Sequence, residues 1–248
     1  MSTVFLSPSA QRENEYVTGN GSEAKFMNLL ADAIEPYLLL NGISYARSDS
    51  GDTVNDAIRK SNAYDPSLHV ALHSNAAPDS APGSLQGPEV YYYRNSTKGK
   101  QAAEDIAQQL TAIYPYGDTA LTIPVNRELA ELVRTKAPSV FIETAYHDNP
   151  QDAAWIEQNI NEIAEAIARG ITDYFGTPFI GTEGAELGRV RLQSGTLNVR
   201  SAPNTNSRVI GALRNGSPVL ILRTLPDWYY VVGNNTAGYV SSRFIERT

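Results

Sequence analysis

The chain has 248 residues and no cysteine, which excludes a disulfide framework, a thiol nucleophile and every metal site built on cysteine. Its formal net charge of −7 argues against general nucleic-acid binding, and no run of 18 apolar residues is present to span a membrane. Only three histidines are available, so a transition-metal site must combine them with carboxylates or weaker oxygen donors.

The first 176 residues alternate helical hydrophobic patterns with short apolar runs, in an order typical of an α/β fold with a mostly parallel sheet flanked by helices. Gly176 follows the last helical pattern and is typical of a helix stop. We expect strands over residues 3–7, 44–47, 68–73, 89–93 and 139–143, and helices over residues 23–40, 52–62, 98–114 and 152–175.

The remaining residues follow a different pattern. Residues 177–190 carry Gly, Pro and Thr without periodicity and are interpreted as a linker, and residues 191–248 contain only short strands and turn residues. Short strands at this spacing predict a small all-β barrel. We therefore expect two domains, 1–176 and 191–248, with strands of the second over residues 196–200, 209–213, 218–223, 228–232 and 238–240.

The charge divides at the same boundary. Residues 1–176 hold 12 Lys and Arg against 23 Asp and Glu, whereas residues 177–248 hold 8 Arg, no Lys and 4 Asp and Glu. The net charge of −7 is thus the sum of an acidic first half and a basic second half.

Polar side chains follow two apolar strands of the first half. His73 ends the run from Leu68, Glu143 ends the run from Ser139, and Glu23 begins the first long helix. Ligands of open α/β sheets bind beyond the carboxyl ends of the strands, so we expect these groups near one another. A histidine and carboxylates at one edge suit a catalytic zinc ion, although spacing alone is a weak signal without a local motif.

The first half resembles the zinc-dependent N-acetylmuramoyl-L-alanine amidases of the amidase-3 type. The resemblance covers the whole half and is carried by Glu23 and by residues 6–14, 28–31, 68–76, 131–143 and 146–150. It implies a Zn2+ cofactor, zinc ligands at Glu23 and His73, and Glu143 as general base and acid. It also implies cleavage of the amide between N-acetylmuramic acid and L-alanine of the peptidoglycan stem.

One departure from the family pattern concerns the third zinc ligand. The family places a histidine after the first strand, where this chain has none and Gln11 is the nearest candidate. His147, four residues beyond Glu143, is the competing donor, and we favour it because imidazole is the better zinc ligand. His69 lies about 13 Å from His73 along an extended strand, so it is expected to be a hydrogen-bonding core residue instead.

Three further side chains are candidates for substrate binding. Asn75 and Asn149 follow the two strand ends, where each can equally shape its own loop. Arg134 is a candidate partner for a carboxylate of the stem peptide, or a solvated surface charge.

The second half resembles a bacterial SH3 domain (SH3b), on residues 197–203, 209–216, 228–231 and 237–242. The resemblance implies that peptidoglycan is its binding partner. Aliphatic residues of these strands are expected in the core, and the exposed aromatic candidates for wall binding are Tyr229, Tyr230 and Tyr239.

We therefore expect a cell-wall amidase with an SH3b wall-binding module. Residues 1–8 carry no basic region followed by a long apolar stretch, so we expect synthesis in the cytosol and action after release, as in a phage endolysin. Two other hypotheses remain: a non-catalytic peptidoglycan-binding protein with a degenerate metal site, and a peptidase acting within the stem peptide.

Overall fold

A computed structural model describes residues 2–117, 120–125, 128–181, 186–234 and 236–247. The chain divides into two compact units, the first comprising Met1–Ile34 and Tyr45–Phe179, the second comprising Glu35–Ser44 and Ile180–Thr248. None of the described helices combines the length and apolar character that a membrane crossing requires.

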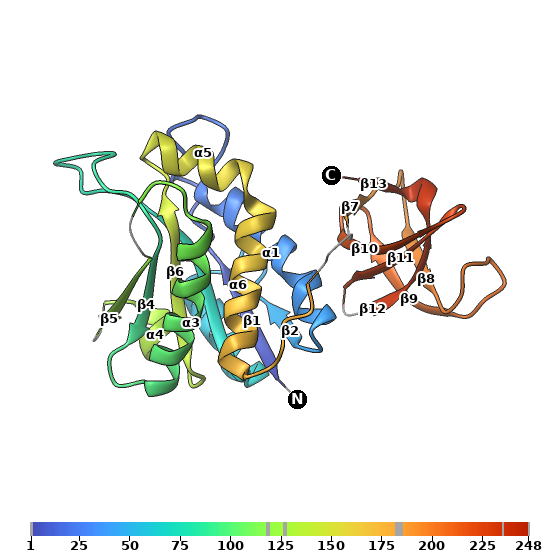
Figure 1. Ribbon diagram of the computed structural model, residues 1–248, viewed down its shortest axis with the longest axis horizontal. Helices are drawn as coiled ribbons and strands as arrows, with labels where there is room; N and C mark the ends of the chain where they lie inside the picture. The colour runs from blue at the N-terminus through green and yellow to red at the C-terminus, as the bar shows by residue number, and fades with distance from the viewer. Residues whose placement is uncertain (1, 118–119, 126–127, 182–185, 235, 248) are drawn as a thin grey trace. The chain divides into compact units, whose positions relative to one another are not determined.

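The first unit is built from alternating strands and helices (Figure 1). Its strands are β1 (Thr3–Pro8), β2 (Ser44–Arg47), β3 (Leu68–Asn75), β4 (Glu89–Tyr93), β5 (Leu121–Val125) and β6 (Ser139–Tyr146). Its helices are α1 (Glu23–Leu40), whose residues from Glu35 onward are grouped with the second unit, α2 (Val54–Tyr64), α3 (Thr97–Ile113), α4 (Ala130–Arg134), α5 (Pro150–Gln158) and α6 (Ile160–Phe175). Strand β5 and helix α4 were not expected from the sequence.

The six strands form one sheet in the order β2-β1-β3-β6-β4-β5. Strands β1, β3 and β6 run parallel, whereas β4 runs antiparallel to β6 and parallel to β5. The prediction of a mostly parallel sheet flanked by helices is confirmed. Seven of the eight residues of β3 are buried, as expected for a central parallel strand covered on both faces.

Two helix ends have a clear local cause in the sequence. The capping box of Thr53 and Asp56 starts α2, and Gly176 ends α6 with a φ of 66°. The single helix expected over residues 152–175 is wrong, because the helix is interrupted at Asn159. The side-chain amide and the backbone N–H of Asn159 both donate to the carbonyl of Trp155, where α5 ends.

The second unit is an antiparallel β structure of seven described strands. They lie in the order β13-β7-β10-β11-β12-β8-β9 around an apolar cluster that includes Val190, Val199 and Val231. Two strands were not expected, and β7 falls within the segment interpreted as a linker; it pairs with β10 and β13 instead. The strands are β7 (Glu186–Val190), β8 (Thr196–Arg200), β9 (Val209–Arg214), β10 (Pro218–Leu225), β11 (Trp228–Gly233), β12 (Thr236–Ser241) and β13 (Ile245–Arg247).

Candidate active site

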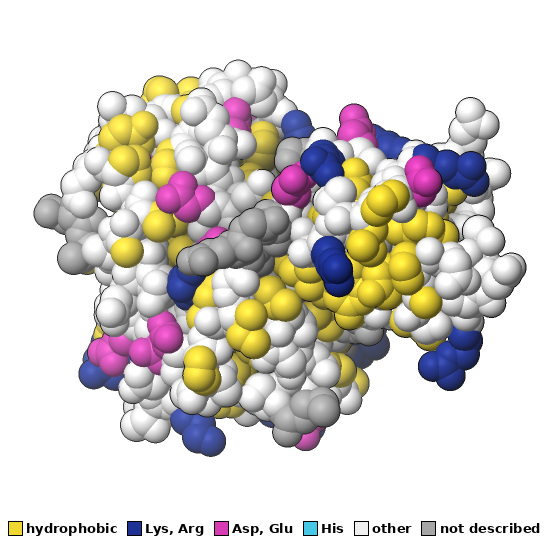
Figure 2. Space-filling view, turned by 45° about the vertical axis from the view of Figure 1, so that its right-hand side comes forward, with side chains coloured by type: hydrophobic (Ala, Val, Ile, Leu, Met, Phe, Trp, Pro, Cys, Tyr) yellow, Lys and Arg dark blue, Asp and Glu magenta, His cyan; other side chains and the backbone are white. Residues whose placement is uncertain are grey.

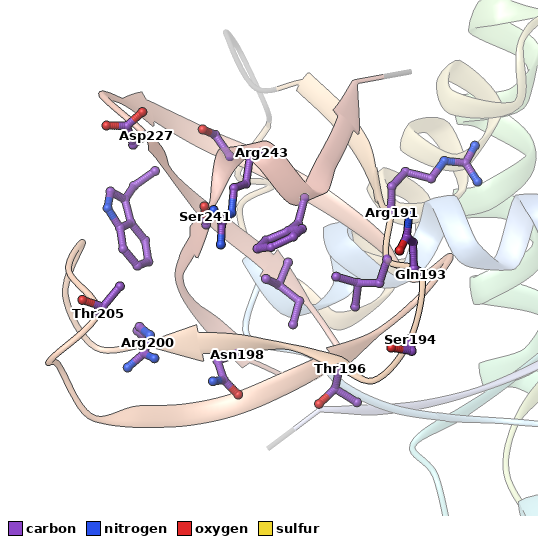
Figure 3. A pocket seen from close by; sticks show the side chains of 15 residues that line it. Arg191, Gln193, Ser194, Thr196, Asn198, Arg200, Thr205, Asp227, Ser241 and Arg243 are labelled. Carbon is purple, nitrogen blue, oxygen red and sulfur yellow. The ribbon is translucent and has the colours of Figure 1, made fainter.

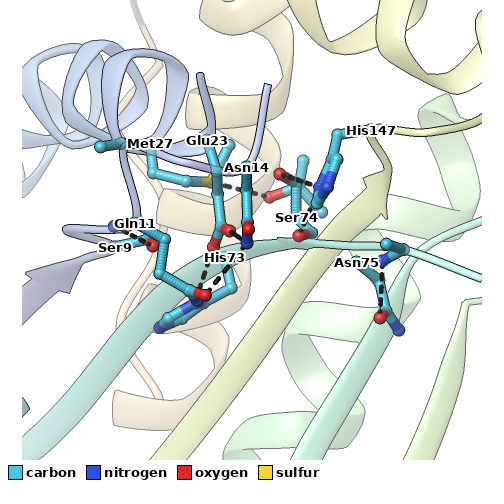
Figure 4. A network of polar contacts seen from close by, with 12 residues as sticks. Ser9, Gln11, Asn14, Glu23, Met27, His73, Ser74, Asn75 and His147 are labelled. Atoms are coloured by element: carbon cyan, nitrogen blue, oxygen red, sulfur yellow. Dashed lines mark hydrogen bonds and ion pairs between the residues drawn. The ribbon is translucent and has the colours of Figure 1, made fainter. Parts of the chain in front are cut away.

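Three of the predicted side chains lie together at the carboxyl ends of β3 and β6. His73 and Glu143 are partners in the register of these strands, and Glu23 is the first residue of α1. Oε1 of Glu23 lies 2.8 Å from Nδ1 of His73, and both side chains are buried (Figure 4). Oε2 of Glu143 is also buried and has no hydrogen-bond partner. A buried carboxylate oxygen without a donor is costly unless it serves a ligand or a proton.

The loop after β1 completes the surroundings of Glu23. The side-chain amide of Asn14 donates to Oε2 of Glu23 at 2.7 Å and to Oε1 of Gln11 at 3.0 Å (Figure 4). The backbone fixes this loop, since the amide nitrogens of Glu23 and Ala24 donate to the carbonyls of Asn14 and Gln11. Gln11 therefore belongs to the same polar network as Glu23 and His73.

The three ionisable groups shift one another's proton affinity. Burial alone raises the pKa of Glu23, but hydrogen bonds with His73 and Asn14 outweigh it and hold that pKa below its ordinary value. Burial lowers the pKa of His73, but contacts with Glu131 and Glu23 raise it to about 9. Burial raises the pKa of Glu143 to about 8, partly opposed by His73.

Sequence reasoning missed Glu131, the second residue of α4. Its Oε2 lies 2.9 Å from Nε2 of His69, and its Oε1 lies 3.7 Å from Nε2 of His73. The other nitrogen of His69 bonds to Ser61, so the expectation that His69 is a hydrogen-bonding core residue is confirmed. No sequence signal identified Glu131, because an acidic residue in the first turn of a helix is ordinary.

The second missed carboxylate is Glu89, the register partner of Glu143 on β4. It accepts hydrogen bonds from the hydroxyls of Tyr91 and Tyr146 and from the side-chain amide of Asn75. Its negative charge is a further cause of the raised pKa of Glu143, after burial and after Glu23. The alternation of Glu89 and Tyr91 along one strand was the available signal, since alternate residues share a face.

His147 lies beside the site in a defined tautomer. Its Nδ1 is 2.8 Å from the backbone carbonyl oxygen of Ser74 (Figure 4). Its ring stacks on that of Tyr16. A carbonyl only accepts, so Nδ1 carries the proton and Nε2 of the neutral ring has a free lone pair. Across the described residues, no group of three or more His, Asp or Glu side chains is arranged to hold a metal ion. Glu23 and His73 are thus brought into contact, and His147 is not.

The candidate substrate-binding residues lie in three different settings. Asn75 donates to Glu89, the carboxylate next to Glu143. The side-chain oxygen of Asn149 caps α5, and its amide holds the loop at residues 83–85. Arg134 is exposed and donates to Asn55 on α2.

The three tyrosines proposed for wall binding lie on β11 and β12. Tyr230 and Tyr239 are register partners whose ring centroids are 4.9 Å apart. Tyr229 packs against the apolar cluster of its unit, with the guanidinium of Arg247 over its ring.

All three histidines are buried. None is visible on the face of the molecule drawn in Figure 2, and His69, His73 and His147 are all buried. The imidazole groups of this chain are therefore placed for interior contacts with carboxylates and backbone.

Comparison with known proteins identifies both units. Residues 10–173 match the family described as N-acetylmuramoyl-L-alanine amidase, and residues 195–246 match the family described as bacterial SH3 domain. The chain is similar to N-acetylmuramoyl-L-alanine amidase LytC of Bacillus subtilis (strain 168), with 28% identity over 181 residues. This similarity covers 70% of the chain but only 35% of that relative.

Solved structures share the fold of the first unit. An N-acetylmuramoyl-L-alanine amidase from Clostridium difficile 630 aligns with a TM-score of 0.63 and 21% identity, covering 71% of this chain and 97% of that one. AmiC2 of Nostoc punctiforme aligns with a TM-score of 0.62 and 20% identity, with the same coverage.

Proposed function

The chain belongs to the N-acetylmuramoyl-L-alanine amidase family, and from this premise we propose that it is a zinc-dependent peptidoglycan hydrolase held on the wall by its SH3b unit. The bond cleaved is the amide between N-acetylmuramic acid and L-alanine of the stem peptide. The observation that carries the proposal is the contact of Glu23 with His73, next to the unpartnered carboxylate oxygen of Glu143.

The donors present fit a zinc ion. Glu23 offers a carboxylate oxygen and His73 an imidazole nitrogen, which are ordinary zinc ligands. In metal sites, the nitrogen of a ligating histidine that does not bind the metal usually donates to a carboxylate or a carbonyl. Glu131 stands 3.7 Å from Nε2 of His73 and is suited to that role if Nδ1 is the ligating atom.

We assign the third donor to His147. The hydrogen bond from its Nδ1 to the carbonyl of Ser74 selects the tautomer that a metal ligand needs, with Nε2 unprotonated. Gln11 is the competing donor and is supported by its place in the network with Asn14 and Glu23. An amide oxygen is the weaker ligand, so we give Gln11 the role of orienting Asn14.

Bound zinc supplies a Lewis acid that polarises the scissile carbonyl and lowers the pKa of a water molecule. Glu143 accepts the proton of the attacking water and delivers it to the leaving amine of L-alanine. Its pKa of about 8 suits a group that must both take and give a proton near neutral pH. The buried position of Oε2 keeps competing bulk water away from this proton transfer.

Asn75, Asn149 and Arg134 keep different proposed roles toward the substrate. Asn75 is placed to contact it directly, because it sits between the strand end and Glu89. Asn149 is proposed to act indirectly, because its side-chain amide donates a hydrogen bond that positions the loop at Gly83. Arg134 is proposed as a contact for a distant part of the stem peptide.

Digestion of purified peptidoglycan tests the proposal. The protein should release new L-alanine amino termini together with free lactyl groups on muramic acid, and Glu143→Gln should release neither. New termini at another residue would favour the stem-peptide peptidase. Binding to the wall with no new termini, at any zinc concentration, would favour the non-catalytic protein with a degenerate metal site.

A further inference from the structure

A groove crosses the second unit between β8 and the turn at Ser242–Phe244 (Figure 3). Its volume is about 890 Å³, which lies in the range of ligand sites. We call it the arginine groove, after the charged members of its lining, which includes Arg191, Asn198, Arg200, Trp228, Arg243 and Phe244.

Two guanidinium groups of the arginine groove lack an acidic partner. Arg243 lies over the ring of Phe244 at 4.5 Å, and Arg200 donates only to the carbonyl of Ser207. Arg191, which also lines the groove, and Arg247, which does not, each form an ion pair with a carboxylate. Within the described residues, no carboxylate lies within ion-pair distance of Arg200 or Arg243. These two side chains stand on opposite walls of the groove in Figure 3.

The aromatic lining adds a second kind of contact. The rings of Trp228 and Phe244 both belong to the lining of the groove. Both rings are partly buried, and Phe244 packs against the apolar cluster of the unit while Arg243 lies over its ring. The side chain of Asn198, another lining residue, offers both a donor and an acceptor to an amide.

We propose that the arginine groove binds an acidic peptide, namely the carboxylate-bearing stem peptide of peptidoglycan. This inference rests on the proposed function and deepens it, because it names the part of the wall that the second unit holds. Guanidinium groups bind carboxylates through paired, charge-assisted hydrogen bonds. The peptide backbone then pairs with Asn198, while Trp228 and Phe244 cover its aliphatic side chains.

The lining favours a peptide over a polymer of phosphates. Asp227 also borders the groove, and its negative charge repels a ligand that is anionic at every repeat. A peptide carries its carboxylates at separated positions. Its aliphatic side chains can also pack on the apolar rings, whereas a phosphate chain has no such side chains. The groove is also distinct from the tyrosine pair Tyr230–Tyr239, neither member of which lines it.

Calorimetric titration of the full chain tests this proposal. The chain carries Glu143→Gln and is treated with a chelator, and the probe is a synthetic stem tetrapeptide with free carboxylates. Arg200→Gln and Arg243→Gln should each weaken binding about tenfold, which corresponds to about 1.4 kcal/mol. The control Arg223→Gln removes the same charge from an exposed position outside the groove and should change the affinity less than twofold. The tetrapeptide with amidated carboxylates should bind at least tenfold more weakly to the parent chain.

Tryptophan emission gives a local readout of the same event. The chain has two tryptophans, and Trp155 is buried in α5, so the Trp155→Phe background isolates Trp228. Its emission should change on addition of the peptide, and this change should be lost in the Arg200→Gln/Arg243→Gln chain.

Three results would overturn the inference. In the first, both arginine variants bind the tetrapeptide as tightly as the parent chain does. In the second, the parent chain binds the amidated and the free peptide equally well. In the third, binding is lost with Tyr230→Ala or Tyr239→Ala and with no groove variant. Wall binding that disappears when phosphate polymers are stripped from the peptidoglycan would also contradict it. Failure of the proposed function is distinguishable: if the Glu143→Gln chain binds the peptide but the wild type with zinc releases no L-alanine termini, the amidase is refuted and peptide binding in the groove is not.

Discussion

The two units use their charged residues in opposite ways. In the first unit, Glu23, His73 and Glu131 are buried and contact one another at the carboxyl end of the sheet. In the second unit the described core cluster is entirely apolar, and arginines such as Arg243 lie at the surface. Burial fixes the orientation of an ionisable group, which proton transfer and metal binding require. Exposure leaves a charge free to meet a ligand, at little cost to the fold.

This difference predicts that removal of a charge has large consequences in the first unit and small ones in the second. The largest effect concerns the proton transfer itself. Glu143→Gln should lower the rate of amide cleavage by about a thousandfold, because it removes the general base and acid. Zinc content and thermal unfolding should stay close to the wild type, since the amide has nearly the same shape. A rate within tenfold of the wild type would assign proton transfer to another group.

The buried carboxylate of Glu131 should matter most for stability. Glu131→Ala leaves Nε2 of His69 without its partner and takes the nearest carboxylate away from Nε2 of His73. Breaking a buried pair costs about 3 kcal/mol of unfolding free energy, measurable by urea denaturation. The matched exposed pair is Arg191–Glu246, whose side chains are 60% and 54% exposed. Equal losses of unfolding free energy from Glu131→Ala and Glu246→Ala would show that burial does not decide how much a charged pair contributes in the two units.

Acid should act on the same carboxylate. Burial opposes ionisation of Glu131, but hydrogen bonds with His69 and contact with His73 lower its pKa from 4.5 to about 2. A lowered pKa in the folded state stabilises the protein above pH 4.5, and this stabilisation is lost as the pH falls toward 2. Unfolding of the metal-free protein, followed from pH 6 to pH 2, should therefore be less acid-sensitive in Glu131→Gln than in the wild type. Parallel profiles for the two proteins would show that another group sets the acid limit.

The choice of third zinc donor predicts a more moderate effect. His147→Ala should weaken zinc binding by at least about tenfold more than Gln11→Ala does, because loss of even an outer partner of a metal ligand costs about 10- to 100-fold. Competition with a chelator of known affinity measures both variants. The reverse order would assign the third ligand to Gln11.

The smallest effect belongs to the exposed pair of the second unit. Glu246→Ala should change the unfolding free energy by about 0.5 kcal/mol or less, because solvent screens a surface ion pair. Urea denaturation at low and at high salt measures this change. A loss above 2 kcal/mol would mean that surface charges support the fold of the second unit as buried ones support the first.

The site residues that could be predicted from the sequence come at the ends of apolar runs. His73 and Glu143 each end such a run, so their positions followed from the topology of parallel sheets. Glu131 was not predictable, because it is 62 residues from His69 and lies on a five-residue helix too short to leave a periodic pattern. Long-range contacts of this kind depend on how elements pack, which local sequence does not specify.

The elements of the fold that were not predicted also depend on packing between distant segments. Strand β5 is five residues long and contains Pro124, a residue that is depleted in strands. Strand β7 begins in a segment rich in glycine, and its pairing with β10 and β13 was visible only once the sheet was assembled. Helices α5 and α6 share one apolar pattern across Asn159, so the periodicity of the sequence does not reveal the break, where Asn159 leaves the helical conformation.

The proposed role of Glu23 and His73 is to hold the zinc ion on which amide cleavage depends. The most direct measurement is the zinc content of the gently dialysed protein, taken together with its rate of release of L-alanine termini. We predict about one zinc per chain, loss of both zinc and activity in His73→Ala, and recovery of activity when zinc is returned to the chelated wild type. Less than about a tenth of a zinc per chain, with no gain in rate on adding zinc, would contradict the account.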